Sequence, residues 1–186
     1  MQESRLSSAL SKRASHALRH APWEYGLELD DQGWVAIDAL SDALGVKPED
    51  IEQMAATSSK DRYEISDGRI RARYGHSLPD RIEMPRAEPP ATLFHGTAPE
   101  SIASIERDGL QPRARQYVHL SPDRETAHIV GRRKARQPVL LVIHAADAAA
   151  AGVAFYRGNE NTWLADAIPP EFIEPSGSPL PPVSSS

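Results

Sequence analysis

The sequence predicts an α+β protein that is divided into two lobes. Three observations support this prediction: helical and hairpin patterns alternate over roughly the first 77 residues, four prolines fall within residues 78–91, and residues 139–143 form a continuous apolar run. We therefore expect an N-terminal lobe at 1–86, a C-terminal lobe with a mixed β-sheet at 87–175, and a disordered Ser/Pro tail at 176–186.

The N-terminal lobe has the order of elements that is typical of a winged helix. Asp38 is placed to cap a helix, and Ser66-Asp67-Gly68 is a turn sequence between two strands. The expected elements are a helix at 6–20, a small hairpin or wing at 27–37, helices at 38–45 and 48–55, and a hairpin of strands 63–65 and 69–73.

The C-terminal lobe is expected to be richer in strands. The apolar run at 139–143 predicts a central strand that is buried on both faces. Gly109 is placed to end the helix that is expected at 99–107. The expected elements are strands at 92–95, 117–120, 139–143, 153–156 and 162–164, and a helix at 99–107.

Composition excludes several classes of protein. The chain has a net charge of −5 and no cysteine, so disulfides and thiolate chemistry are absent and bulk electrostatic coating of nucleic acid is not expected. The sequence contains neither a secretory leader nor a run of about 18 apolar residues, which favours a cytoplasmic protein without a membrane span. A phosphate site would therefore have to be local, built from clustered arginines.

Arg19 and His20 are the first candidate pair, at the end of the first predicted helix. Cations in a last helical turn are favoured by the helix dipole, which by itself explains their position. His16 lies one turn earlier, and an i, i+4 histidine pair can bind a metal, but no third ligand is nearby. We therefore predict no metal, and leave open a purely structural role for the pair.

A second candidate group lies on the second predicted hairpin. Arg69, Arg71 and Arg73 alternate with apolar residues, which places three guanidinium groups on one face of a strand. Such a face is either an ordinary solvated one or an anion site, which Arg62 on the partner strand could join.

A third group lies in the C-terminal lobe, where His95-Gly96-Thr97 is expected to end a strand and open a helix. Free backbone N–H groups at such a point can bind a diphosphate or a ribose. The alternative is that Thr97 simply caps the helix, with Glu100 completing a capping box. His119 and Ser121 likewise have an alternative role in packing and in capping the next helix. Because the chain has no Rossmann glycine motif and no P-loop, a dinucleotide would have to bind in another way.

Taken in order, these motifs resemble those of one family, the NAD-dependent RNA 2′-phosphotransferases known as Tpt1 or KptA. The resemblance covers about residues 8–175. It is carried by Ser11-Lys12, Ser15, Leu18-Arg19-His20, Gly26-Leu27, Gly33-Trp34-Val35, Lys60-Asp61-Arg62-Tyr63, Ile70-Arg71-Ala72, Gly75-His76-Ser77, His95-Gly96-Thr97, Val118-His119-Leu120-Ser121, Gly131-Arg132-Arg133, Phe155-Tyr156-Arg157, Trp163-Leu164 and Pro170-Glu171.

The resemblance implies a winged-helix lobe that binds the RNA phosphate and a lobe with the ADP-ribosyltransferase fold that binds NAD⁺. It implies three sets of residues. The catalytic set is Arg19, His20, Arg62 and Arg133; the set that contacts NAD⁺ is His95, Gly96, Thr97, Gly109, Leu110, His119, Ser121 and Phe155; and the set that contacts the RNA phosphate is Lys12, Arg19, His20, Arg62 and Arg71.

The reaction implied by the resemblance uses NAD⁺ as a co-substrate and no metal. An internal 2′-phosphate of a tRNA-like RNA, of the kind left by tRNA splicing, attacks the nicotinamide ribose, and nicotinamide leaves. The ribose 2″-hydroxyl then attacks the phosphorus of the ADP-ribosylated RNA, which gives 2′-hydroxyl RNA and ADP-ribose 1″,2″-cyclic phosphate. We expect a monomer.

The chain departs from the family pattern at several places, which leave the arginines intact and concern mainly the contacts on the nicotinamide side. Tyr117 stands where the family often has a histidine, and Tyr74 where a glutamine is common. Lys60-Asp61-Arg62-Tyr63 replaces a frequent Lys-Gln-Arg-Phe, and Glu160-Asn161-Thr162 replaces Asn-Gly-Val. Two other functions stay open: ADP-ribosylation that caps a terminal phosphate of RNA or DNA, and a winged-helix DNA binder that regulates transcription. The products formed from NAD⁺ distinguish the three.

Overall fold

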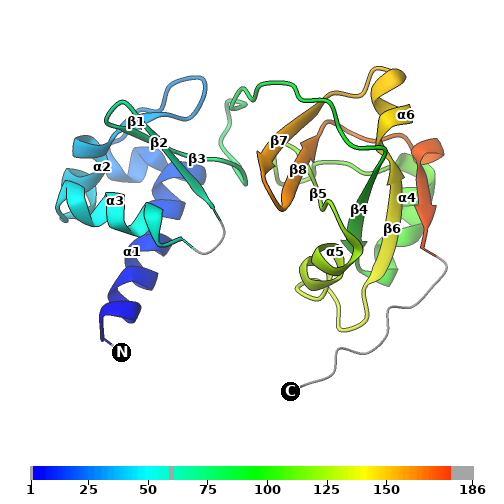
Figure 1. Ribbon diagram of the computed structural model, residues 1–186, viewed down its shortest axis with the longest axis horizontal. Coiled ribbons are helices and arrows are strands. Elements are labelled where there is room, and N and C mark those ends of the chain that lie inside the picture. The colour runs from blue at the N-terminus through cyan, green and yellow to red at the C-terminus, as the bar shows by residue number, and fades with distance from the viewer. Residues whose placement is uncertain (1, 59–60, 177–186) are drawn as a thin grey trace. The chain divides into compact units, whose positions relative to one another are not determined.

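A computed structural model describes residues 2–58 and 61–176 (Figure 1). The chain divides into two compact units, one formed by 1–85 with 113–116 and the other by 86–112 with 117 to the C-terminus. The described chain combines six α-helices with three small antiparallel sheets, which confirms the mixed α and β class. All but the first residue of the predicted tail lie outside the described residues.

The first unit packs three helices against a three-stranded antiparallel sheet of order β1-β3-β2. Ala14, Ala17 and Leu18 are fully buried, because their spacing places them on one face of the first helix. The elements are α1 (Gln2–Arg19), a 3₁₀ turn (Pro22–Tyr25), β1 (Val35–Ala36), α2 (Ile37–Leu44), α3 (Pro48–Ala56), β2 (Tyr63–Ser66) and β3 (Arg69–Ala72).

The turn chemistry of this unit follows the sequence closely. Gly45 ends α2 in the left-handed conformation, and Pro48 occupies the first turn of α3. Asp67 and Gly68 both have positive φ, at 50° and 70°, as the tight turn between antiparallel strands requires. The predicted hairpin of β2 and β3 is therefore confirmed.

Two local predictions for the first unit were wrong. Residues 27–30 form no strand, because the Asp30 carboxylate accepts hydrogen bonds from the Gln32 and Trp34 N–H groups and closes a turn. Val35 pairs instead with Ile70 of β3. The N-cap of α2 is Ala36, so Asp38 lies inside the first turn, where its charge still favours the helix dipole.

The second unit contains two three-stranded antiparallel sheets, of orders β4-β6-β9 and β5-β8-β7. Its elements are β4 (Thr92–Thr97), a 3₁₀ turn (Pro99–Ser101), α4 (Ile102–Asp108), β5 (Val118–Leu120), α5 (Arg124–Gly131), β6 (Val139–His144), α6 (Ala145–Ala150), β7 (Phe155–Asn159), β8 (Thr162–Ala165), a 3₁₀ turn (Pro170–Phe172) and β9 (Ile173–Pro175).

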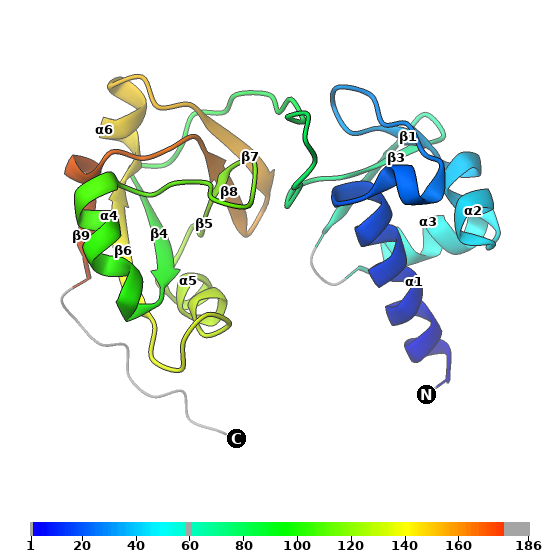
Figure 2. The ribbon, with the colours of Figure 1, turned by 180° about the vertical axis from the view of Figure 1, so that it is seen from behind.

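The predicted central strand is confirmed as β6, which pairs with β4 on one side and β9 on the other. Leu141 and Ile143 are buried on one of its faces and Leu140 on the other, while Val139 and Val142 stay partly exposed. Figure 2 shows α4 and α5 on opposite sides of β4 and β6. Burial on both faces therefore holds for only part of the strand.

Two helix starts in the second unit differ from the predictions. Asp123 caps α5 by accepting from the Thr126 N–H at 2.7 Å, while Ser121 is buried and exchanges backbone hydrogen bonds with Phe94. Thr97 is the last residue of β4, and its helix begins after Ala98, so the capping alternative for Thr97 is wrong.

Candidate functional site

The end of α1 presents an arginine whose surroundings are unusual. The Arg19 guanidinium lies 6.0 Å from the Tyr63 ring centroid and 5.2 Å from the Tyr74 ring centroid. Its Nε and Nη2 atoms are buried and have no hydrogen-bond partner among the described residues. Buried donors without partners are costly, so this pair of atoms indicates the place of an anionic ligand.

The electrostatics of Arg19 point in the same direction. Burial lowers the pKa of Arg19, and the positive charges of Arg62 and Arg115 lower it further, while Tyr63 and Tyr74 act in the opposite sense. No carboxylate is among the described groups that shift this pKa. The positive charges of Arg62 and Arg115 thus lie near Arg19, whose pKa no described carboxylate raises, and this arrangement favours a phosphate.

His20, the next residue, is held by a short polar network. Its Nδ1 lies 2.8 Å from Ser77 Oγ, and the Ser77 N–H donates to the Arg19 carbonyl oxygen at 2.9 Å. Burial lowers the pKa of His20, and the charges of Arg19, His16 and Arg115 lower it further. The imidazole is therefore neutral at neutral pH, and a neutral ring can accept a proton.

Arg115 joins this group from a distant part of the sequence. It belongs to the segment 113–116, which lies within the first unit. A Cβ at Gly75 would stand 3.2 Å from Arg115 Nη1 and 3.7 Å from Arg19 Nη1, and Gly75 has a φ of 88°. Glycine at this position therefore lets both guanidinium groups lie against one stretch of backbone.

His76, which follows Gly75, is almost completely buried, and its Nε2 has no hydrogen-bond partner among the described residues. Burial lowers its pKa to about 4, helped by the charges of Arg19, His20 and Arg71. The histidine is thus held neutral at the edge of the arginine group.

Arg62 and Lys12, both predicted to contact phosphate, also lie in the first unit. Arg62 is half-buried, lowers the pKa of Arg19, and makes no ion pair with another described residue. Lys12 is exposed and lies seven residues before Arg19, two turns along the same side of α1. The structure thus groups Arg19, His20 and Arg62, with Lys12 further along the helix.

Arg71, also predicted to contact phosphate, has a different environment. Its Nε and Nη2 lie 2.8 and 2.7 Å from Glu64 Oε2 across the β2–β3 pair, and its guanidinium stacks 4.6 Å from the Trp34 ring. Arg69 pairs with Asp30 and Arg73 with Asp61. Arg69 and Arg71 lie on β3 and Arg73 follows it, and each of the three has an acidic partner within the fold. A contact between Arg71 and the RNA phosphate stays a prediction.

In the second unit, His95 on β4 is the best-defined candidate. Its Nδ1 lies 2.8 Å from the His119 carbonyl oxygen, so Nδ1 carries the proton and Nε2 is left as an acceptor. Nε2 lies 3.5 Å from Lys134 Nζ. Burial, together with the positive charge of Lys134, lowers the pKa of His95 to about 4. A fixed neutral imidazole of this kind can accept a hydrogen bond from a ribose hydroxyl.

The other predicted NAD⁺ contacts fall into two classes. His119 on β5 is partly exposed, and its Nδ1 lies 3.0 Å from the Tyr117 carbonyl oxygen. Ser121 is buried beside Phe94 of β4, and Arg124 covers the Phe94 ring at 5.3 Å. These residues lie next to Phe94 and His95 in the middle of β4.

The remaining members of that set pack the interior. A Cβ at Gly96 would lie 2.1 Å from the Ala127 carbonyl oxygen, because α5 packs directly onto β4 there. A Cβ at Gly109 would lie 2.1 Å from the Ile168 carbonyl oxygen. Leu110 and Phe155 are buried in the hydrophobic core of this unit, so neither belongs to the site proposed below.

Arg133, predicted to be catalytic, is exposed in the turn after α5 in the second unit. The residues near Arg19 that sequence reasoning missed are Arg115 and His76. Arg115 was visible in the sequence only as part of an arginine pair with Arg113. No local pattern joins residue 115 to residue 19, because the contact depends on the path of the chain.

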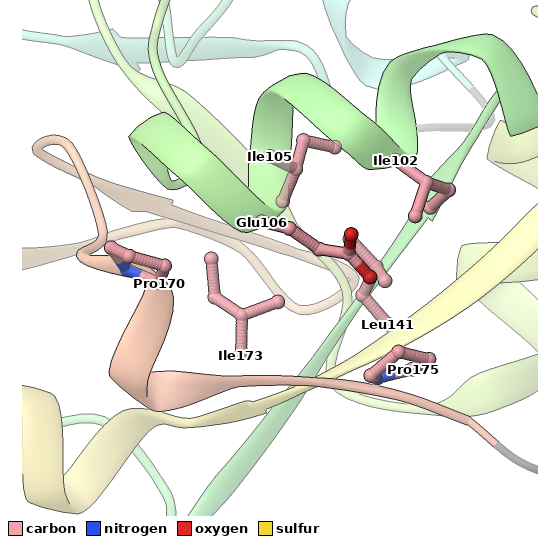
Figure 3. Close-up of a pocket in the computed structure, with 7 residues that line it drawn as sticks. All are labelled: Ile102, Ile105, Glu106, Leu141, Pro170, Ile173 and Pro175. Atoms are coloured by element: carbon pink, nitrogen blue, oxygen red, sulfur yellow. The ribbon is translucent and has the colours of Figure 1, made fainter.

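An apolar pocket of about 200 Å³ lies elsewhere in the second unit (Figure 3). Its lining comes from α4, β6 and the C-terminal segment, and Glu106 is the charged residue among them. None of the predicted site residues lines it, and its apolar walls do not suit a phosphate. Lining residues are Ile102, Ile105, Glu106, Leu141, Pro170, Ile173 and Pro175.

The described residues contain no helix long and apolar enough to cross a membrane. They also contain no cluster of three histidine, cysteine or acidic side chains arranged to hold a metal ion.

Comparison with known proteins identifies the family. Residues 5–167 match the model of the RNA 2′-phosphotransferase, Tpt1/KptA family. The chain is 53% identical over 173 residues to the "Probable RNA 2′-phosphotransferase" of Acetivibrio thermocellus, covering 89% of this chain and 95% of the relative. It is 48% identical over 180 residues to the protein of the same name from Bacillus thuringiensis, covering 93% and 97%. The chain therefore belongs to the Tpt1/KptA family of RNA 2′-phosphotransferases.

Proposed function

We propose that this RNA 2′-phosphotransferase transfers an internal RNA 2′-phosphate to NAD⁺ and releases 2′-hydroxyl RNA, nicotinamide and ADP-ribose 1″,2″-cyclic phosphate. The observation that carries the proposal is the Arg19 guanidinium, whose Nε and Nη2 atoms are buried without a hydrogen-bond partner among the described residues and whose pKa no described carboxylate raises. An RNA 2′-phosphate is dianionic at neutral pH and offers the oxygens that these groups lack. In this proposal the first unit is a winged-helix lobe and the second an ADP-ribosyltransferase-like lobe of a cytoplasmic enzyme.

The phosphate is held by Arg19, Arg62 and Arg115 in the first unit. Arg19 donates from Nε and Nη2, while Tyr63 and Tyr74 keep its plane fixed. A preorganised fork costs little reorganisation when charge moves onto the phosphate oxygens. Arg115 takes the place that the resemblance gave to Arg133, because it is Arg115 that lies beside Gly75 and Arg19.

Two displacements follow from this arrangement. A phosphate oxygen attacks C1″ of the nicotinamide ribose, the bond from C1″ to nitrogen breaks, and neutral nicotinamide leaves. The ribose 2″-hydroxyl then attacks phosphorus, and the bond from phosphorus to the RNA 2′-oxygen breaks. The neutral His20 accepts the proton of the attacking hydroxyl and returns it to the departing 2′-oxygen.

In the second unit, we propose that His95, Thr97, His119 and Ser121 contact NAD⁺. The Nε2 of His95 is oriented by the bond from Nδ1 to the His119 carbonyl, so it is a fixed acceptor for a ribose hydroxyl. Lys134 Nζ, 3.5 Å from the same nitrogen, supplies a positive charge that suits the diphosphate. Bound NAD⁺ supplies the electrophilic C1″ and the nicotinamide leaving group.

The test is to incubate the protein with NAD⁺ and an oligonucleotide that carries one internal 2′-phosphate, and to identify the products by mass. We expect 2′-hydroxyl RNA, nicotinamide and ADP-ribose cyclic phosphate in equal amounts. The same oligonucleotide without the 2′-phosphate is the control and should consume no NAD⁺. An ADP-ribosylated 5′-phosphate without cyclic phosphate would instead show capping chemistry, and no NAD⁺ consumption would overturn the proposal.

A further inference from the structure

We propose that Gln116 is a positioning residue that holds Arg115 in the phosphate site. The inference rests on the proposed function, since it concerns how one arginine of that site is brought to the substrate. Gln116 touches no reacting atom in this account, and acts through the backbone that carries its neighbour.

The side chain of Gln116 bonds three backbone groups of the segment that follows Ser77. Its Oε1 accepts from the Ile82 N–H at 2.9 Å, and its Nε2 donates to the Leu78 and Asp80 carbonyl oxygens at 3.0 and 2.8 Å. Its own N–H donates to the His76 carbonyl oxygen at 3.3 Å. One residue thereby joins the segment 113–116 to residues 76–82 at four points.

These bonds satisfy backbone groups that no helix or strand pairs, since residues 78–82 form neither. Only glutamine supplies this pattern. Glutamate lacks the two donors and would place a negative charge against two carbonyl oxygens, asparagine is one methylene shorter, and leucine has a similar volume without any polar atom.

The position of Arg115 depends on this attachment. Consecutive Cα atoms are about 3.8 Å apart, so fixing the Gln116 backbone and side chain also fixes the backbone of Arg115. Residues 113–116 belong to the first unit although the chain on either side of them belongs to the second. Gln116 therefore holds the segment 113–116 against the first unit, and this attachment places Arg115 beside Gly75 and Arg19.

The test compares Gln116→Leu, Arg115→Ala and the double variant in single-turnover assays with 2′-phosphorylated RNA and NAD⁺. We expect Gln116→Leu to lower the rate of product formation about 30-fold, because a displacement of roughly 1 Å in a catalytic group costs up to 100-fold. The double variant should be no slower than Arg115→Ala, since both changes remove the same guanidinium. Gln111→Leu is the matched control: its Nε2 bonds the Asp108 carbonyl oxygen, in the second unit, and its rate should stay within twofold of wild type.

A merely structural role would give a different pattern. In that case Gln116→Leu would lower the thermal midpoint, and its effect on the rate would add to the effect of Arg115→Ala in the double variant. Such additivity would overturn the proposal. A folded Gln116→Leu enzyme with a normal rate would overturn it as well. If Gln116→Leu does not fold, Gln116→Asn serves as the second variant. Its amide is too short for all three bonds, and its rate should fall between wild type and Arg115→Ala; a normal rate would overturn the proposal.

The Arg115→Ala and Gln116→Leu variants also distinguish a failure of the Gln116 proposal from a failure of the proposed function. A normal rate for Arg115→Ala would remove Arg115 from the phosphate site and overturn both. An impaired Arg115→Ala enzyme beside a normal Gln116→Leu enzyme would overturn the inference about Gln116 alone.

Discussion

Two groups of arginines in the first unit have opposite electrostatic surroundings. Arg69 and Arg71 on β3 and Arg73, which follows it, each pair with an acid, and Arg71 makes two contacts with Glu64. The buried Nε and Nη2 atoms of Arg19 have no hydrogen-bond partner among the described residues, and the positive charges of Arg62 and Arg115 lower its pKa. The comparison teaches that arginine density alone does not locate an anion site.

The two groups differ in what compensates the desolvation cost of the guanidinium. A buried or half-buried guanidinium is tolerated when a carboxylate or carbonyl satisfies it within the fold, as on β3. Where the fold supplies no such partner, the unpaired guanidinium lowers the stability of the protein, and a bound ligand can accept its hydrogen bonds. Removing Arg19 should therefore affect activity and stability in opposite directions.

The largest effect is expected for Arg19→Met, which keeps an unbranched side chain between the two tyrosines but removes the charge. Turnover of 2′-phosphorylated RNA should fall about 1,000-fold, the size of effect seen when an oriented donor to a developing negative charge is lost. The free energy of unfolding should rise by about 1 kcal/mol, because two unsatisfied buried donors disappear. Single-turnover kinetics and urea unfolding measure the two quantities, and a less stable variant would contradict the comparison.

The second effect concerns which arginine completes the Arg19 group. Arg115→Ala should lower turnover about 100-fold, because Arg115 lies beside Arg19 in the first unit, whereas Arg133→Ala should lower it less than about fivefold. The two variants are matched in residue type and in exposure. Equal losses would return Arg133 to the phosphate site, as the family resemblance implied.

The third effect extends the comparison to pH. The pKa of His76 is held at about 4 by burial and by the charges of Arg19, His20 and Arg71, and that of His95 at about 4 by burial and Lys134. An unfolded histidine binds a proton near pH 6.5, so the folded state binds fewer protons between pH 4 and 6.5. Stability is therefore complete above about pH 6.5 and is lost as the pH falls, by at most about 3 kcal/mol for each histidine.

The ring resonances of the two histidines, followed by NMR, test this directly. Both should stay neutral down to about pH 4 in the wild type. In Arg19→Met the pKa of His76 should rise while that of His95, which Arg19 does not influence, stays the same. A rise in neither would show that burial alone holds His76 neutral.

The smallest effect is expected for Arg71→Met. The Arg71–Glu64 pair is partly exposed, with side-chain exposures of 13% and 31%, so its loss should cost about 1 kcal/mol of unfolding free energy. Turnover should stay within about threefold of wild type, because Arg71 is already neutralised. A double-mutant cycle with Glu64→Gln gives the coupling energy, and a turnover loss as large as that of Arg19→Met would end the distinction between the two groups.

Much of the fold was predictable because its signals are local. The helix that ends at Arg19, the hairpin turn at Asp67-Gly68 and the central strand at 139–143 each follow from periodicity or from backbone conformations that few residues adopt. The predictions that were wrong concern positions where two residues or segments can form the same strand pair or helix cap. Val35 pairs with Ile70 in place of a neighbouring strand, and Asp123 caps α5 in place of Ser121, because the alternatives are equally good within the local sequence.

The sequence by itself determined the family, the order of elements and the candidates Arg19, His20, Arg62 and His95. The tertiary structure decided which charges are neutralised: Glu64 forms an ion pair with Arg71, while no acid of the described part of the chain shifts the pKa of Arg19. It also brought Arg115 close to Arg19, which lies 96 residues earlier in the chain, and bonded the neighbouring Gln116 to residues 76–82. The reason is physical, because charge pairing and desolvation depend on distances of a few ångströms that the path of the folded chain sets.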